Sequence, residues 1–556
     1  MPTKYIFVSG GVISGVGKGI TVSSIALLLK SAGFKVAPIK CDPYLNLDAG
    51  TMNPIVHGEV FVTSDGMETD QDIGHYERFI AEDLTRFNYM TLGQVYDAVI
   101  KRERSLEYGG ECVEVVPHVP REIIHRVKEL GQKQKADFVI IEIGGTSGEF
   151  QNMMFLEAAR EMKYKNPGDV LNIHVAYLPS PPSLGELKSK PVQTSVHLLN
   201  DVGIQPDIII GRAERNLDRI RKEKISIFCG VDIEDVFSNP DVKNIYEVPI
   251  ILEEQGLAKR ILDKLGVKEG KNDLADWKRF LAKVKEAKKT VKIGLVGKYF
   301  LSGEYNLEDS YICVLEAIKH AAFNLGIRPE ISWIDAEEVE KNGQSALEKF
   351  DGIIVPQGWG SRGTEGKISA IQYAREKKVP YLGLCFGMQM AVIEFARHVL
   401  GLKNANSTEV DPKTHDPVIH IMPDQEEYLK KKQYGGTIRL GDWPCKISPG
   451  TKLADIYKKP SAIRHTPSAV LERHRHRYEF NNKYRDSFEK GGMTLAGNSP
   501  DGKLVEAVEL RDHPFFIGTQ FHPEFKSRPL QPHPIFSSFI KACLPAGRLA
   551  LETSKW

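Results

Sequence analysis

The sequence predicts an α/β protein of two domains, in which each domain is a mostly parallel sheet flanked by helices. A chain of 556 residues is too long for one ordinary hydrophobic core. In the first half, an apolar run at residues 5–8 and a helically spaced run at residues 23–30 enclose a glycine-rich turn. In the second half, an apolar run at residues 379–384 leads through a turn into a helix that we expect to reach residue 399. Strands that alternate with helices favour parallel pairing in both halves.

The bulk composition excludes several classes of protein. A hydrophobic content of 41% and a charged content of 26% are typical of soluble globular proteins, and a formal net charge of +1 argues against a nucleic-acid-coating surface. No apolar run is long enough for a membrane span, and the first strand follows Met1 too closely for a signal peptide. The seven cysteines are scattered and include no Cys-x-x-Cys pair. We therefore expect a cytoplasmic protein with reduced thiols.

The glycine-rich turn at residues 10–19 predicts a phosphate-binding loop. It reads Gly-Gly-Val-Ile-Ser-Gly-Val-Gly-Lys-Gly and joins the first strand to the first helix. Glycines let backbone N–H groups approach phosphate oxygens, the helix N-terminus favours anions, and Lys18 adds a positive charge. The usual pattern places Ser or Thr after the lysine, whereas Gly19 follows it here. A tight structural turn with a surface lysine is the alternative.

An acidic segment punctuated by glycines occupies residues 57–79, and residues 65–72 read Asp-Gly-Met-Glu-Thr-Asp-Gln-Asp. Carboxylates at this density beside a phosphate loop suit Mg²⁺, which shares its oxygen ligands with phosphates. Taken singly, each carboxylate is equally well a helix cap or a surface charge. Lys40 ends a predicted strand at residues 36–40, where it either reaches the phosphates or stays in solvent.

The clearest buried strand of the first half covers residues 137–141 and is followed by Glu142 and a Gly-Gly turn. Ligands of doubly wound sheets bind outside the carboxyl ends of the strands, so Glu142 is a candidate metal or nucleotide ligand. Further strands are expected at residues 173–178, 207–211 and 245–248.

Two basic stretches follow in the same half. Residues 188–193 read Lys-Ser-Lys-Pro-Val-Gln, and two lysines braced by a proline are candidates for binding a second triphosphate. We interpret most of the basic residues at 212–224 as a solvated helix face. The strongly charged residues 268–290 are interpreted as a linker that carries a helix with Trp277 and Phe280.

In the second half, residues 383–387 read Gly-Leu-Cys-Phe-Gly between a strand and a helix. This is the pattern of a nucleophile elbow with a thiol in place of the hydroxyl. The turn exposes the sulfur of Cys385, and the N-terminus of the following helix favours a thiolate. A buried cysteine is more often inert packing, but packing does not require two flanking glycines. We therefore predict that Cys385 is a nucleophile.

A thiolate nucleophile needs a base, and the predicted strand that begins at residue 516 delivers His522, with Glu524 two residues further on. A carboxylate at that spacing can orient the imidazole. Other histidines gather in residues 473–478, Arg-His-Arg-His-Arg-Tyr. Because no carboxylate stands at comparable spacing there, we interpret that cluster as a binding or interface patch.

Taken together, these motifs resemble two known families over nearly the whole chain. Residues 383–389, 406–409 and 521–524 resemble the class I, triad-type glutamine amidotransferase domain. Residues 10–19, 65–79 and 188–191 resemble the synthetase domain of the CTP synthase family. The resemblance implies a synthetase domain at residues 1–267 that is similar to P-loop proteins, a linker at 268–290, an amidotransferase domain at 291–545 and a tail at 546–556.

The resemblance also implies roles for individual residues. It implies Cys385, His522 and Glu524 as the catalytic triad, and Asp72 and Glu142 as Mg²⁺ ligands. The implied ATP-binding residues are Gly15, Val16, Gly17, Lys18, Gly19, Ile20, Lys40, Asp72 and Arg212. The implied UTP- and CTP-binding residues are Ser14, Glu149, Phe150, Gln151, Lys188, Ser189, Lys190, Pro191, Val192, Gln193 and Lys224. The implied glutamine-binding residues are Gly358, Gln389, Glu409 and Arg477.

From the same resemblance we expect ATP-dependent amination of UTP to CTP with ammonia that the triad releases from glutamine and an internal channel delivers. We also expect GTP as activator, CTP as product and feedback inhibitor, and a homotetramer that binds neither nucleic acid nor membrane. Two alternatives stay open: a glutamine-dependent amidase of the cobyrinate type that activates a carboxylate, and a catalytically silent scaffold or filament subunit. Analysis of the product formed from UTP distinguishes them.

Three stretches depart from the family pattern. Residues 148–151 read Gly-Glu-Phe-Gln where the family has Gly-Asp-Ile-Glu, so a carboxylate near the pyrimidine nucleotide is missing and CTP feedback is open. Gln357 replaces the first glycine of a Gly-Gly pair on the oxyanion strand. Gly109 stands within Tyr-Gly-Gly where the family has Tyr-Leu-Gly, so the strength of GTP activation is open.

Overall fold

The computed structural model describes residues 1–53, 57–183, 185–271, 273–298, 301–302, 305–306, 308–422, 425–431, 435–458 and 469–545. The chain forms two compact units: Met1–Ala49 with Asp72–Leu281, and Gly50–Gln71 with the chain from Ala282 onward. Residues 50–71 therefore pack with the second unit, although they lie within the sequence range expected for the first domain. The expected tail at residues 546–556 lies outside the described residues. No described helix is long and apolar enough to cross a membrane.

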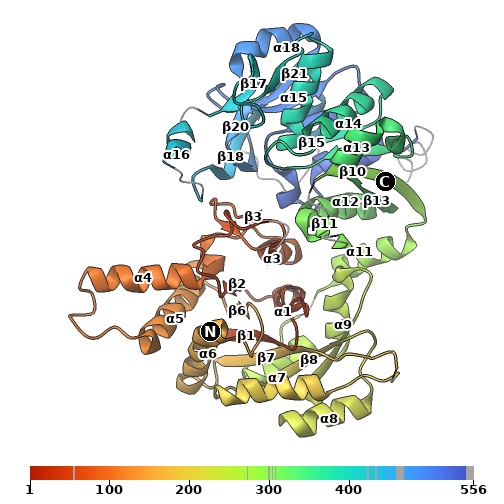
Figure 1. Ribbon diagram of the computed structural model, residues 1–556. Helices are drawn as coiled ribbons and strands as arrows, with labels where there is room; N and C mark the ends of the chain where they lie inside the picture. The colour runs from red at the N-terminus through yellow and green to blue at the C-terminus, as the bar shows by residue number, and fades with distance from the viewer. Residues whose placement is uncertain are drawn as a thin grey trace. The chain divides into compact units, whose positions relative to one another are not determined.

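The first unit contains a seven-stranded sheet in the order β5-β2-β6-β1-β7-β8-β9, and every neighbouring pair in it is parallel (Figure 1). Its strands are β1 Lys4–Gly11, β2 Val36–Asp42, β5 Tyr89–Thr91, β6 Phe138–Ile143, β7 Val170–Tyr177, β8 Ile208–Ala213 and β9 Val236–Pro240. The central strands are buried along nearly their whole length, which is why the sequence shows them as continuous apolar runs.

Helices pack on this sheet and provide its hydrophobic core. They are α1 Lys18–Ser31, α3 Asp72–Ile80, α4 Leu92–Arg104, α5 Val115–Gln134, α6 Met153–Lys165, α7 Lys190–Asp201, α8 Arg219–Cys229, α9 Val248–Glu254, α10 Leu257–Lys264 and α11 Ala275–Glu286. One core cluster joins Phe7 and Ile39 of the sheet to α4, α5 and α6. Helices α4 and α5 lie side by side (Figure 1).

The strand predicted at residues 245–248 is wrong. Residues Ile245–Glu247 form a short 3-10 turn that leads into α9, and the edge of the sheet is instead β9. Two local signals explain this. Asn244 caps the turn by accepting from the N–H of Tyr246, and Pro249, which lacks an N–H, stands in the first turn of α9, where helices tolerate it.

The predicted linker does carry a helix, α11, but the first part of this helix is packed within the first unit. Trp277 is 2% exposed, and its Nε1 donates to the carbonyl of Tyr246 at 2.8 Å. Phe79 and Phe280 complete an aromatic cluster around these two rings, with centroid separations of 5.3 and 5.7 Å to Tyr246. The charged residues of the region therefore flank a buried aromatic contact.

The second unit contains a nine-stranded sheet in the order β13-β10-β14-β15-β23-β22-β21-β18-β19. The strands from β13 to β23 pair in parallel, and those from β23 to β19 pair antiparallel. Their bounds are β10 Lys289–Gly297, β13 Ile327–Asp335, β14 Gly352–Val355, β15 Tyr381–Leu384, β18 Arg439–Ile447, β19 Val470–His476, β21 Met493–Asn498, β22 Val505–Leu510 and β23 Phe516–Thr519.

Helices and smaller sheets complete the second unit. The helices are α12 Ile312–Asn324, α13 Ala336–Asn342, α14 Thr364–Lys377, α15 Phe386–His398, α16 Glu426–Lys430, α17 Lys452–Tyr457, α18 Arg485–Gly491 and α19 Pro534–Ala542. The additional strands are β3 Phe61–Val62, β4 Glu68–Thr69, β11 Leu301–Ser302, β12 Tyr305–Asn306, β16 Ala405–Ser407, β17 Asp416–Ile421 and β20 Tyr478–Phe480. Strands β3 and β4 form a hairpin within residues 50–71.

Candidate functional site

The predicted phosphate loop lies at the carboxyl end of β1. Gly15 and Gly17 adopt positive φ angles of 70° and 91°, a conformation that glycine reaches without strain, and α1 then begins at Lys18. Lys18 is 7% exposed and donates from Nζ to the carbonyl of Gly145 at 2.6 Å. Burial lowers the pKa of Lys18. The alternative of a turn with a surface lysine is therefore wrong.

Gly19 has a steric reason to replace the usual Ser or Thr. A Cβ atom at this position would lie 2.0 Å from Oδ1 of Asp72. The first turn of α1 is therefore open only to glycine while the Asp72 carboxylate stands beside it. A side chain at position 19 would therefore require the Asp72 carboxylate to shift.

Lys40 contacts three carboxylates of the site. Its Nζ donates to Asp72 Oδ2 and, at 2.9 Å, to Glu142 Oε1, and it lies 3.9 Å from Asp42 Oδ1. The Lys40 side chain is only 7% exposed. Because these four groups converge in the interior, Lys40 is part of the site and not a solvated lysine.

Burial shifts the protonation of these groups. Burial raises the pKa of Glu142 to about 7 and that of Asp42 to about 6. Burial also opposes ionisation of Asp72, but the charge of Lys40 outweighs it and lowers the pKa of Asp72. Asp42 Oδ2 has no hydrogen-bond partner among the described residues. Clustered carboxylates with a free oxygen fit a hard divalent cation such as Mg²⁺.

The sequence missed two members of this cluster. Asp42 lies two residues after Lys40 on β2, so the alternation of a strand places both on the same face, and this spacing was a usable signal. Tyr76 of α3 donates its hydroxyl to Glu142 Oε2. No sequence pattern pairs a tyrosine of α3 with a carboxylate of β6.

Arg212 lies over the phosphate loop. Its Nη1 would be 2.8 Å from a Cβ atom on Gly17, and its Nε donates to Asp241 at 2.7 Å. Arg219, in contrast, is exposed and pairs with Glu223 on the same helix, which confirms a solvated helix face for that residue. Among the implied ATP-binding residues, Lys18, Lys40, Asp72 and Arg212 are thus all gathered around the loop.

The residues implied for UTP and CTP are arranged in two groups. In the first, Glu149 accepts from the N–H and hydroxyl of Thr146 at 3.0 Å each, and Gln151 donates to Glu149 at 3.0 Å. The side chain of Gln151 is exposed, and so are those of Ser14 and Phe150.

The second group surrounds the N-terminus of α7. Glu186 pairs with Lys188 and, at 2.5 Å, with Arg221, and the positive charge of Lys224 also acts on it. Ser189 accepts from Gln193 at 3.2 Å. Lys190 and Pro191 start the helix, and the side chain of Val192 is fully buried in the core.

In the second unit, Cys385 occupies a sharp turn between β15 and α15, with φ 51° and ψ −100°. Cβ atoms at the two flanking glycines would meet the backbone: the Cβ at Gly387 would lie 2.0 Å from the carbonyl of Val355, and that at Gly383 would lie 2.9 Å from the backbone of Gly387. The glycines are therefore required by the turn, as a nucleophile elbow demands. The backbone N–H of Cys385 donates to the carbonyl of Thr519 at 2.7 Å.

His522 follows β23 and is 1% exposed. Its Nδ1 lies 2.6 Å from Glu524 Oε1, and its ring stacks on Phe525 with centroids 4.9 Å apart. Burial disfavours the imidazolium, but Glu524 and the sulfur of Cys385 outweigh burial and raise the pKa of His522 to about 10. His522 Nε2 has no oxygen or nitrogen partner in the described part of the chain. The structure thus brings Cys385, His522 and Glu524 together.

Strand β19 positions both reactive groups. The carbonyl of Arg473 accepts from the N–H of His522 at 2.7 Å, and the carbonyl of Arg475 accepts from the thiol of Cys385 at 3.7 Å. Gln520, which sequence reasoning missed, donates from Nε2 to the sulfur at 3.5 Å. Its position two residues before His522 was the only available signal.

The residues implied for glutamine binding lie on several elements. Glu409 accepts from the N–H of Gly360 at 2.7 Å, and burial raises the pKa of Glu409. Gln389 donates to the carbonyl of Tyr478 at 3.0 Å, and Arg477 donates to Thr437 at 3.1 Å.

Two buried lysines lie beside Gly358 and were not foreseen. A Cβ atom on Gly358 would lie 3.0 Å from Cε of Lys298 and 3.4 Å from Nζ of Lys367. Burial lowers the pKa of Lys298 to about 8 and that of Lys367 well below its usual value.

The interpretation of the histidine cluster as a binding or interface patch is wrong. His474 and His476 are fully buried, with their facing nitrogens 3.1 Å apart, and burial lowers both pKa values well below the usual range. A carboxylate from β22 does lie close by: Glu506 is within 3.8 Å of His474. Arg439 pairs with Glu506 at 2.8 Å and lies 3.4 Å from His476, so a guanidinium already occupies the place where these three groups could hold a cation.

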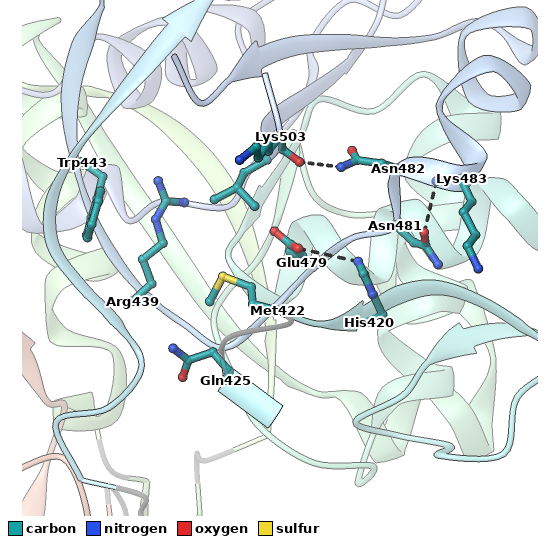
Figure 2. A pocket seen from close by; sticks show the side chains of 11 residues that line it. His420, Met422, Gln425, Arg439, Trp443, Glu479, Asn481, Asn482, Lys483 and Lys503 are labelled. Carbon is teal, nitrogen blue, oxygen red and sulfur yellow. Dashed lines mark hydrogen bonds and ion pairs between the residues drawn. The ribbon is translucent and has the colours of Figure 1, made fainter. Parts of the chain in front are cut away.

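A separate cavity of about 610 Å³ adjoins this network (Figure 2). Arg439 and Trp443 line one side of it, and Asn481 and Lys483 line another. His420 and Glu479 form an ion pair of 3.6 Å on its wall. None of the triad residues lines it, so this cavity is distinct from the triad site.

Comparison with known proteins gives two family matches. The family described as "CTP synthase N-terminus" matches residues 4–267, and "Glutamine amidotransferase class-I" matches residues 306–542. A CTP synthase of Caldanaerobacter subterraneus subsp. tengcongensis is 51% identical over 543 residues, which cover 97% of this chain and 98% of that protein. A CTP synthase of Carboxydothermus hydrogenoformans is 51% identical over 549 residues, 98% of this chain and 100% of that protein.

The solved structures that match include one glutaminase domain. It is titled "Trypanosoma brucei CTPS - glutaminase domain with bound acivicin", is 37% identical, and covers 46% of this chain and 93% of its own, with a TM-score of 0.40.

Proposed function

Because this chain belongs to the CTP synthase family, it is a ligase of pyrimidine biosynthesis that converts UTP to CTP with ATP and glutamine, and we propose that the two sites described above carry its two half-reactions. The observation that carries the proposal is the contact set of Cys385, His522 and Glu524 on a strained elbow. Residues 1–267 then act as the synthetase, residues 268–290 as the linker and residues 291–545 as the amidotransferase.

In the glutaminase half, the thiolate of Cys385 attacks the side-chain amide carbon of glutamine. His522 is held as an imidazolium by Glu524, so it can donate a proton to the departing ammonia and later take one from the attacking water. A thioester forms in the first step and is hydrolysed to glutamate in the second. Backbone N–H groups near Gly358 and at the start of α15 stabilise the oxyanion.

Around the glutaminase centre, Gln389, Glu409 and Arg477 bind the substrate glutamine. Glu409 supplies a carboxylate for the substrate ammonium group, and Arg477 supplies a guanidinium for the substrate carboxylate. The ammonia that is released reaches the synthetase site through an internal channel.

In the synthetase half, ATP phosphorylates O4 of UTP and thereby turns a poor leaving group into phosphate, which ammonia displaces. The backbone of residues 15–20, with Lys18 and Lys40, holds the triphosphate of ATP and neutralises charge that develops during transfer. Asp72 and Glu142 would hold a Mg²⁺ ion, which would supply positive charge to stabilise the phosphate groups during transfer.

The remaining assignments concern ligands and assembly. Arg212 lies near the adenine side of ATP. Ser14, residues 149–151 and 188–193, and Lys224 bind UTP, or CTP as feedback inhibitor. GTP activates the enzyme, and the protein is a cytoplasmic homotetramer. Light scattering with and without nucleotides tests the assembly, and a GTP titration tests the activation.

The central experiment measures CTP formed from UTP and ATP, with glutamine or with ammonia as the nitrogen source. Wild type should use both. Cys385→Ser should lose only the glutamine reaction, because the nucleophile serves only glutamine hydrolysis. Cys112→Ser, at an exposed cysteine outside both sites, is the matched control and should keep both reactions. Equal loss of both reactions in a folded Cys385→Ser protein would refute the assignment of two sites, and a product other than CTP would refute the function.

A further inference from the structure

Glu59 is a buried carboxylate that the proposed mechanism does not use. It lies in the segment 50–71 of the second unit and is 4% exposed. Its Oε1 accepts from Nε2 of Gln357 at 2.5 Å, and its Oε2 accepts from the N–H of Cys313 at 2.7 Å. A carboxylate removed from water needs such donors, and hydrogen bonds to an ionised oxygen are strong. The side chain of Gln357 is therefore hydrogen-bonded to the segment that contains Glu59.

Gln357 is also held through its backbone. Its carbonyl accepts from the hydroxyl of Tyr311 at 3.3 Å. The peptide bond is planar and trans, so the carbonyl of Gln357 and the N–H of Gly358 point in opposite directions from one plane. Fixing the carbonyl and the side chain of Gln357 thus fixes the direction of the Gly358 N–H.

Gly358 lines the same cavity as the catalytic base His522. Glu59, Gln357, Gly358 and His522 all line one small cavity of about 30 Å³, which is room for one or two water-sized molecules. The Gln357–Glu59 hydrogen bond is therefore part of the wall that contains the catalytic base. Gly358 has no side chain of its own to hold its position.

We propose that Gln357 is a positioning residue for glutamine hydrolysis, because its hydrogen bond to Glu59 holds the Gly358 N–H in the orientation that stabilises the oxyanion. The inference rests on the proposed glutaminase function. The hydrogen bond makes the oxyanion donor depend on the placement of the segment that contains Glu59.

The test exchanges the donor and the acceptor of the Gln357–Glu59 hydrogen bond. In Gln357→Glu, two carboxylates face each other, and kcat for glutamine hydrolysis should fall at least tenfold with little change in KM, since loss of an oxyanion donor costs about 10²–10³ in rate. In the double variant Gln357→Glu/Glu59→Gln, the new amide accepts from Cys313 with its oxygen and donates to the new carboxylate with its nitrogen. This variant should recover most of the lost kcat. Glu59→Gln alone should be mild, because the Gln357 amide can turn and accept.

Gln357→Gly removes the side chain without adding charge and should lower kcat by roughly three- to tenfold, which keeps the test valid if Gln357→Glu folds poorly. A wild-type kcat in Gln357→Glu and Gln357→Gly, or no recovery in the double variant, would overturn the inference. Ammonia-dependent CTP formation should stay at the wild-type level in all of these variants. If wild type itself makes no CTP from ammonia, the proposed synthetase function fails, while glutamine hydrolysis still decides the role of Gln357.

Discussion

Replacement of Lys40 by methionine tests the electrostatic reasoning about the synthetase site. The methionine keeps much of the volume and removes a cation that contacts Asp72, Glu142 and Asp42. The Glu142 and Asp42 side chains are 1% and 4% exposed, so water cannot replace the lost partner. Breaking a buried ion pair costs about 3–5 kcal/mol. For a unit of this size that corresponds to a fall in Tm of about 6–20 °C.

The deficit should depend on pH with a definite sign. Glu142 and Asp42 have pKa values raised to about 7 and about 6, above those of an unfolded chain. Their contribution to stability is therefore favourable at a pH below their pKa values in the unfolded chain. It is lost as the pH rises through their pKa values in the folded protein. Without Lys40 the pKa values of both carboxylates rise further. The pH range over which their contribution to stability is lost therefore extends to higher pH. At pH 5.5 the Tm deficit of Lys40→Met should reflect mainly the loss of the partner of Asp72, whose pKa Lys40 lowers, and the deficit should be larger at pH 8, where Glu142 and Asp42 also ionise.

The assay is thermal unfolding of the full chain without nucleotide or Mg²⁺ at the two pH values. Lys30→Met is the matched control, because Lys30 pairs with Glu82 at an exposed position, where an ion pair contributes about 0–1 kcal/mol. A Lys40→Met deficit no larger than that of Lys30→Met, or one that is equal at pH 5.5 and pH 8, would show that Lys40 does not neutralise these carboxylates.

Three further predictions concern the two half-reactions. In Glu524→Gln the pKa of His522 should fall from about 10, so the basic limb of the kcat/KM profile for glutamine should move to lower pH, and an unmoved limb would contradict the role of Glu524. Asp72→Asn and Glu142→Gln should each raise the Mg²⁺ concentration needed for ammonia-dependent CTP synthesis, and unchanged titrations at fixed ATP would return both residues to structural roles. Gln151→Glu should strengthen inhibition by CTP roughly tenfold, because it introduces an acceptor-only group at the proposed pyrimidine-nucleotide site; equal inhibition constants would contradict this.

The sequence was sufficient where function constrains consecutive residues. The phosphate loop and the elbow around Cys385 are both strand–turn–helix units with glycines at fixed offsets, and the structure shows steric reasons for Gly19 and Gly387. The base and its carboxylate, His522 and Glu524, stand two residues apart and were likewise visible in order. Local geometry determines such motifs, so they can be read without knowing the fold.

Other features depend on which strands become neighbours, and only the tertiary structure decided them. Asp42 joins Glu142 because β2 lies beside β6 in the sheet, and Tyr76 reaches Glu142 from α3, which packs against β2. Glu506 of β22 meets His474 of β19 although β21 and β18 stand between these strands in the sheet order. The short apolar run at residues 245–248 became a turn and a helix start, since Asn244 caps the turn.

The placement of residues 50–71 was equally beyond the sequence. Glu59 lies within a stretch that motif order assigns to the synthetase, yet its carboxylate binds Gln357 and Cys313 of the second unit. A carboxylate is buried wherever donors converge on it, and these donors come from positions about 250 and 300 residues away along the chain. Hydrophobic periodicity and motif spacing report the neighbours of a residue along the chain, whereas contacts of this range are set by the packing of the whole unit.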